Sequence, residues 1–103
     1  MAASKLTVLA DVIRSKNAGP TQLTIDIFFR DASSYAQAVA SPALLPAAVA
    51  RLYHCDAAQV RRYDLPAISA IKLSMPRQRC AGDPGDGDVY GAQQHAPLLE
   101  LLV

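Results

Sequence analysis

The chain has 103 residues, of which 51% are hydrophobic but 19 are alanine, so we expect one domain over residues 1–103 with a modest core. Its formal net charge of +1 provides no general attraction for a nucleic acid or an anionic membrane, and no apolar run approaches the ~18 residues of a membrane span. A cytoplasmic protein without nucleic-acid or membrane partners is therefore expected. So small a core would gain stability from a companion chain or from a homo-oligomer.

The N-terminal segment fits two kinds of element. Apolar residues recur at helical spacing after Ser4, a residue type that caps helices, and predict a helix over about residues 5–15. Alternate residues between Leu6 and Val12 also fit a strand. Either element must end at residues 17–20, because Asn and Gly tolerate the left-handed conformation and Pro cannot extend a helix.

The rest of the chain alternates between strand and helix patterns. In order, we predict a strand at 22–29, a helix capped by Asp31 and ending at Ala40, a helix at 44–53, and strands at 60–65, 68–75 and 98–103. A capped turn is expected at residues 56–59, and Arg61 and Arg62 are interpreted as a solvated pair. These elements predict an α/β (α+β) fold, a compact two-layer domain with one mixed sheet of about four strands and two to three helices.

The first candidate site is the segment from Arg14 to Gly19. Arg14 offers a planar fork for oxyanions, Lys16 a point charge, and the backbone amides near Gly19 can form an anion-binding nest. Ser15 and Asn17 add a hydroxyl and an amide. The segment could therefore bind a carboxylate or a phosphate. Alternatively, it is only the end of a helix, where cations interact favourably with the helix dipole.

The second candidate site is a long polar loop at about residues 77–97, whose Gly, Pro and Asp content argues against helix or sheet. Its proton-transfer candidates are Asp88, Tyr90 and His95, and its candidate ligand-binding residues are Arg77, Asp86, Gln93 and Gln94. A lone histidine more often makes a structural hydrogen bond. Lys72, on the preceding strand, could meet the same ligand, although solvated charges are the alternative for Lys72 and Arg77.

Neither a metal nor a cofactor is expected. The two cysteines, Cys55 and Cys80, have no CxxC spacing and no nearby histidine pair, so they are interpreted as reduced structural thiols. The aspartates of the polar loop miss the calcium-binding EF-hand spacing. No dinucleotide-binding, Walker or Ser-His-Asp pattern is found.

Four blocks, spread over nearly the whole chain, carry a resemblance: VIRSKNAGP at 12–20, LTIDI at 23–27, AIK with PR at 70–72 and 76–77, and DVYGAQQHAPLL at 88–99. They look like the bacterial family named domain of unknown function 4387, although Gly87 stands where a hydroxyl residue is expected. Members of this family resemble companions of the acyclic terpene utilisation family, larger proteins to which they are fused or beside which they are encoded. A second, distant similarity, to the small C-terminal domain of those proteins, involves Arg14-Ser15 with Gly19, residues 60–66 and Ala70-Ile71.

The resemblance implies that the chain is a small subunit of a two-part assembly. In this hypothesis Arg14, Lys16 and Lys72 bind the carboxylate or CoA-type anion of a small metabolite, and residues 86–95 dock into the larger, acyclic-terpene-utilisation-like subunit. Two alternatives remain open. The chain is itself a lyase, hydratase or isomerase acting on small carboxylic acids through the proton-transfer groups of the polar loop, or it is a self-assembling small-ligand-binding module.

Overall fold

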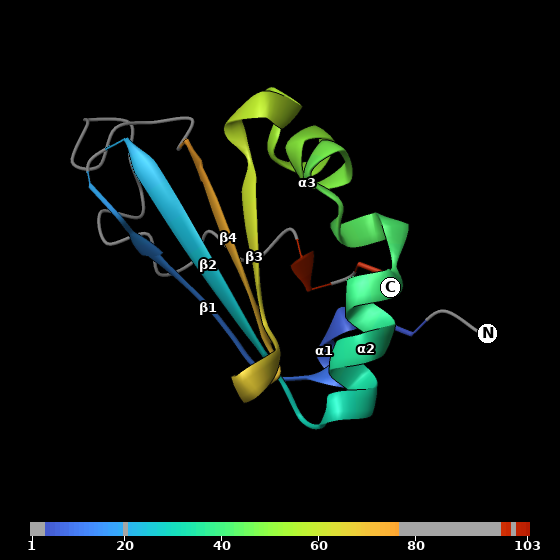
Figure 1. Ribbon diagram of the computed structural model, residues 1–103. Helices are drawn as coiled ribbons and strands as arrows, with labels where there is room; N and C mark the ends of the chain where they lie inside the picture. Colours follow the sequence, from blue (N-terminus) through green and yellow to red (C-terminus); the bar gives the residue numbers. More distant parts are fainter. Residues whose placement is uncertain (1–3, 20, 77–97, 100) are drawn as a thin grey trace.

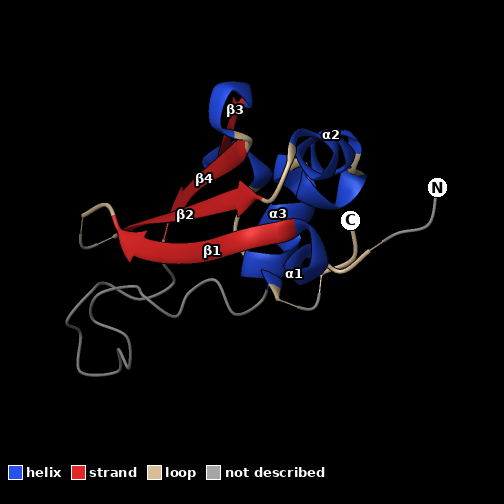
Figure 2. Cartoon of the chain, turned by 90° about the horizontal axis from the view of Figure 1, so that it is seen from below, coloured by secondary structure: helices blue, strands red, loops and turns tan. Residues whose placement is uncertain are grey.

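A four-stranded sheet forms one layer of the molecule. The computed structural model describes residues 4–19, 21–76, 98–99 and 101–103. The sheet consists of β1 (Ala10–Asn17), β2 (Gln22–Phe29), β3 (Arg61–Leu65) and β4 (Ala70–Pro76), in the order β1-β2-β4-β3, and Figure 2 shows the strands in this order. Every neighbouring pair is antiparallel. The α+β class and the four strands are confirmed, whereas the sheet is antiparallel instead of mixed. Short connections join β1 to β2 and β3 to β4, and such hairpins pair strands antiparallel.

The helices form the second layer. Figure 1 shows α1 (Leu6–Leu9), α2 (Ala32–Ala40) and α3 (Pro46–Tyr53) on one side of the sheet. The core lies between the layers and consists of inward-facing strand residues and helix residues, among them Ile25, Ile27, Ile71, Leu73, Met75, Leu6, Leu44 and Val49. None of the described helices has the length and apolar character needed to cross a membrane.

The two predicted second-layer helices are confirmed with small shifts, and so is the Asp31 cap of the first. The Asp31 carboxylate accepts a hydrogen bond of 2.7 Å from the Ser34 amide at the start of α2, and this bond lowers the pKa of Asp31. The second helix begins at Pro46 instead of residue 44, because a separate 3-10 turn, η1, occupies Pro42–Leu44. Proline suits the first position of a helix, since its missing N–H would have no helical partner there.

The predicted N-terminal helix is wrong over most of its length. Only Leu6–Leu9 are helical, and residues 10–17 form β1, whose backbone pairs with β2 at Ala10 and from Val12 to Asn17. A register shift between Ala10 and Val12 reverses the alternation, so Val12 is 47% exposed while Ile13 faces the core. The predicted end of the element is confirmed, because β1 stops at Asn17.

The predicted C-terminal strand does not join the sheet in the part of the chain that the structure describes. Leu102 instead pairs with Lys5 in a single antiparallel bridge, and hydrogen bonds of 2.8–3.1 Å join Ser4 to Val103. Leu98 and Val103 are buried in the core. The alternation of apolar residues in this segment therefore reflects packing against the N-terminal residues. The fourth strand of the sheet is β1 and not this C-terminal segment.

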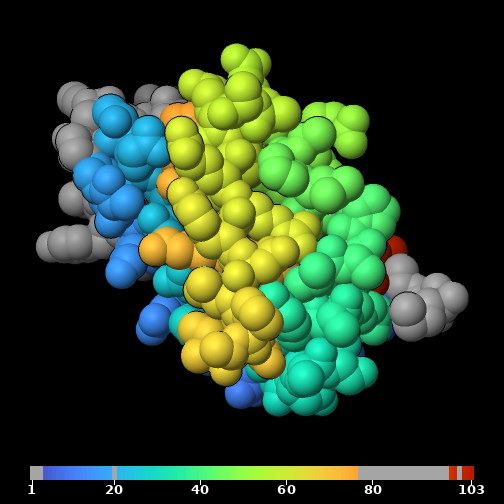
Figure 3. Space-filling model, in the orientation of Figure 1, coloured from blue at the N-terminus to red at the C-terminus, as the bar shows by residue number. Residues whose placement is uncertain are grey.

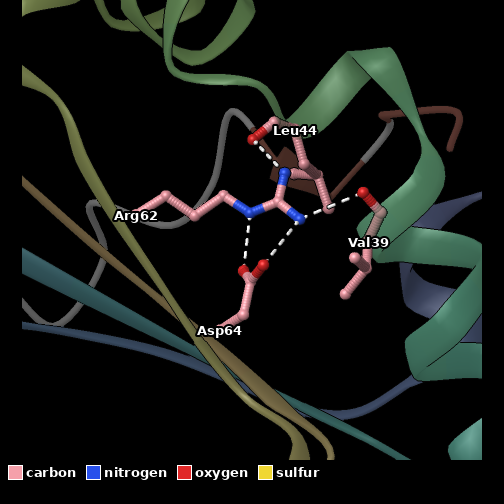
Figure 4. Close-up of polar contacts among 4 residues, drawn as sticks. All are labelled: Val39, Leu44, Arg62 and Asp64. Carbon is pink, nitrogen blue, oxygen red and sulfur yellow. Dashed lines mark hydrogen bonds and ion pairs between the residues drawn. The ribbon is translucent and has the colours of Figure 1, made fainter.

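Arg62 joins the two layers, so its interpretation as a solvated residue is wrong. Its side chain is only 10% exposed, and its Nε donates to Asp64 Oδ1 at 2.7 Å. Its Nη1 and Nη2 donate to the carbonyls of Leu44 at 3.2 Å and Val39 at 3.1 Å (Figure 4). Arg61, the preceding residue, is exposed as expected.

Candidate anion-binding site

No described helix covers the second side of the sheet, which we call the outer face. Directly paired residues of antiparallel strands have their side chains on the same side. The cross-strand register therefore defines three rows on the outer face: Lys16–Thr24–Ser74–Arg61, Arg14–Asp26–Lys72–Tyr63 and Val12–Phe28–Ala70–Leu65. Two of the rows are polar, and the third is apolar. In Figure 3 the edge strand β3 (yellow) runs between the helices (green) and the remaining strands.

The two polar rows concentrate positive charge. They hold four cations and one carboxylate, a net charge of +3 against +1 for the whole chain. The carboxylate, Asp26, lies 3.9 Å from the Arg14 guanidinium, which also stands 5.1 Å from the centre of the Phe28 ring. Among the described residues, neither Lys16 nor Lys72 forms an ion pair. No described carboxylate therefore neutralises either charge.

A shallow pocket lies on the outer face, between the turn that follows β1 and strand β3. Its volume is about 480 Å³, and the described residues that line it are Ala18, Thr24, Tyr63, Leu65, Lys72 and Ser74. Thr24 is only 4% exposed, yet neither its hydroxyl nor that of Ser74 forms a side-chain hydrogen bond with the described residues. One ammonium and two hydroxyls that can still donate hydrogen bonds can bind an oxyanion, because hydrogen bonds to a charged group are stronger than those between neutral groups.

Three predicted ligand-binding residues come together on the outer face. Arg14 and Lys16 lie on β1, and Lys72 lies two strands away on β4, with β2 between them. Only Lys72 lines the pocket. The alternative for Arg14 and Lys16, cations near the end of a helix, is wrong because the segment is a strand.

The other predicted residues of this segment are placed differently. Ser15 is buried opposite Ile25, and Asn17 pairs with Leu23, so both point toward the helix layer, and each already interacts within the protein. Gly19 lies in the turn after β1 with a φ of +110°, a conformation that side-chain-bearing residues rarely adopt.

The predicted residues of the polar loop lie outside the described residues, and their roles stay predictions: Arg77, Asp86, Asp88, Tyr90, Gln93, Gln94 and His95. Of the two cysteines the structure describes Cys55. Burial, and secondarily the Asp56 carboxylate, raise the pKa of its thiol. A protonated thiol is a poor nucleophile, which agrees with a structural role for Cys55.

Besides Ala18, which lies within the first candidate segment, four described pocket residues were not predicted as site residues: Thr24, Ser74, Tyr63 and Leu65. Alternation along the strands does place Thr24 and Ser74 opposite the core-facing residues. It does not indicate that β4 inserts between β2 and β3, which is what brings the four side chains together.

A family model described as Domain of unknown function (DUF4387) matches residues 6–102. The chain belongs to this family. The match confirms the family resemblance drawn from the sequence, and it includes the four described strands and the described pocket residues of the DUF4387 chain. Comparisons with curated proteins and with solved structures found no match.

Proposed function

We propose that this DUF4387 chain is a small subunit that binds a small anionic metabolite, through a carboxylate or CoA-type anion, on its outer face. The observation that supports this is the gathering of Arg14, Lys16 and Lys72 on one face of a nearly neutral chain. A local concentration of one charge raises the local concentration of oppositely charged ligands. The hydroxyls of Thr24 and Ser74, which line the same pocket as Lys72, supply directional hydrogen bonds to the ligand.

The expected affinity is modest. Each exposed charge pair contributes roughly 0.2–1 kcal/mol, because water and salt screen it. A few such contacts together with two hydroxyl hydrogen bonds correspond to a dissociation constant on the order of 1 mM, and binding should weaken as salt rises. Asp26 limits the affinity further, since it stands beside Arg14 and Lys72 in the same row.

Propionate is expected to bind in an isothermal titration at low salt, whereas propionamide, which has a similar shape but no charge, is not. The double variant Arg14→Gln/Lys16→Gln should bind propionate about three- to tenfold more weakly, because it removes two cations of the outer face. The control Arg30→Gln/Arg51→Gln has the same net charge but changes residues after β2 and on α3. Equal weakening in both double variants would contradict a site on the outer face.

A larger companion is the second part of the proposal, and the sequence resemblance to partners of acyclic terpene utilisation proteins supports it. The exposed apolar residues Val12 and Ile68 are consistent with a surface that another subunit covers. Purification of the tagged chain from its native host under mild conditions is expected to yield one larger, acyclic-terpene-utilisation-like protein in stoichiometric amount. Recovery of a solitary monomer would count against the companion and leave the anion site unaffected.

A further inference from the structure

The pocket has two chemically different halves. Lys72, Thr24 and Ser74 form a polar half over β2 and β4, while Tyr63 and Leu65 of β3 form an apolar half together with Ala18. Tyr63 is 45% exposed and Leu65 38%, so both keep apolar surface that a ligand could remove from water. Tyr63 lies directly opposite Lys72, which places the two halves side by side.

The charge around the pocket favours a single negative charge. Among the described residues that line it, Lys72 is the only cation. Asp26, directly opposite Lys72 on β2, adds a carboxylate that would repel a second negative charge on the ligand. Arg14 and Lys16 belong to the same face but not to the lining, and Arg14 already neighbours Asp26 at 3.9 Å.

We infer that the ligand of this pocket is a monocarboxylate with a short apolar body. This inference rests on the proposed function and names its ligand class. The carboxylate accepts hydrogen bonds from the Lys72 ammonium and the hydroxyls of Thr24 and Ser74, and the apolar body lies against the Tyr63 ring and Leu65. A bare oxyanion would fill only the polar half and would leave the apolar surfaces of β3 in water.

Titration with acetate, butyrate and hexanoate at constant ionic strength tests the inference. Affinity is expected to rise about twofold for each added methylene, less than full burial would give, because the pocket is shallow. Hexanoate should therefore bind more tightly than acetate by about an order of magnitude, and more tightly than sulfate or phosphate.

The variant Leu65→Asn is expected to flatten this dependence on chain length while acetate binding stays within about twofold of the wild type. Its control is Leu45→Asn, which changes a leucine at the start of α3 that is somewhat more exposed, at 49% against 38%. If the Leu65 variant does not fold, the titrations of the wild-type protein with the three acids still test the inference. Acetate binding without any dependence on chain length, or tighter binding of sulfate, overturns the inference alone. Absence of binding by every acid overturns the proposed function as well.

Discussion

Replacing Arg62 by alanine is expected to lower the free energy of unfolding by about 2–4 kcal/mol, measured by urea denaturation. The guanidinium donates to Asp64 on its own strand and to the carbonyls of Leu44 and Val39 in the helix layer. Val39 belongs to the last turn of α2, and the last carbonyls of a helix have no helical partner. The variant leaves two carbonyls without this donor and removes a largely buried side chain.

Most of this effect should come from the carbonyls and not from the ion pair. Asp64 is half-exposed, so water can replace its partner at little cost. Arg62→Lys should therefore give an intermediate loss, because a single ammonium cannot reach both carbonyls and Asp64 in the geometry of a planar fork. The neighbouring Arg61→Ala, on the exposed outer face, is the matched control and should change stability by less than about 0.5 kcal/mol. Equal losses at positions 61 and 62 would contradict the role assigned to Arg62.

The charge reversal Lys72→Glu is expected to weaken propionate binding by at least about tenfold. It replaces the only cation among the described lining residues by a carboxylate beside Asp26. A tenfold change corresponds to about 1.4 kcal/mol, less than a charge-assisted hydrogen bond can contribute. Stability should fall by no more than about 1 kcal/mol, because Lys72 is exposed and forms no ion pair with the described residues. Arg51→Glu on α3 makes the same change of net charge and should leave propionate affinity within about twofold.

The strands that can be predicted from the sequence are those whose two sides differ in polarity. Large aliphatic residues alternate with polar ones over residues 23–27 of β2 and 71–75 of β4, so both strands and their core-facing residues follow from local sequence. β1 cannot be identified in this way. Leu9 faces the core from the one-turn helix α1, and Ala10 and Ile13 face it from β1, on either side of the register shift. Because of this shift, the three core-facing residues have the spacing of a helix although two of them lie in a strand.

The site is less predictable than the fold because it depends on pairing between distant segments. The sequence suggests that Arg14, Lys16 and Lys72 bind an anion, but nothing local indicates that β4 lies next to β2 and brings Lys72 beside Thr24. For Arg62 the sequence predicts a solvated side chain, whereas the structure shows a largely buried one. Charged residues on a short edge strand are normally solvated, and only the positions of the Val39 carbonyl in α2 and the Leu44 carbonyl in η1 reveal the buried role of Arg62.

Backbone amide chemical shifts, followed by NMR during a propionate titration, test the central claim most directly. In the wild type the largest changes should cluster on the outer face at Thr24, Tyr63, Lys72 and Ser74, with the amides of α2 and α3 unchanged. In Lys72→Glu these changes should disappear. Changes centred on the helices, or identical changes in the two proteins, would contradict an anion site on the outer face.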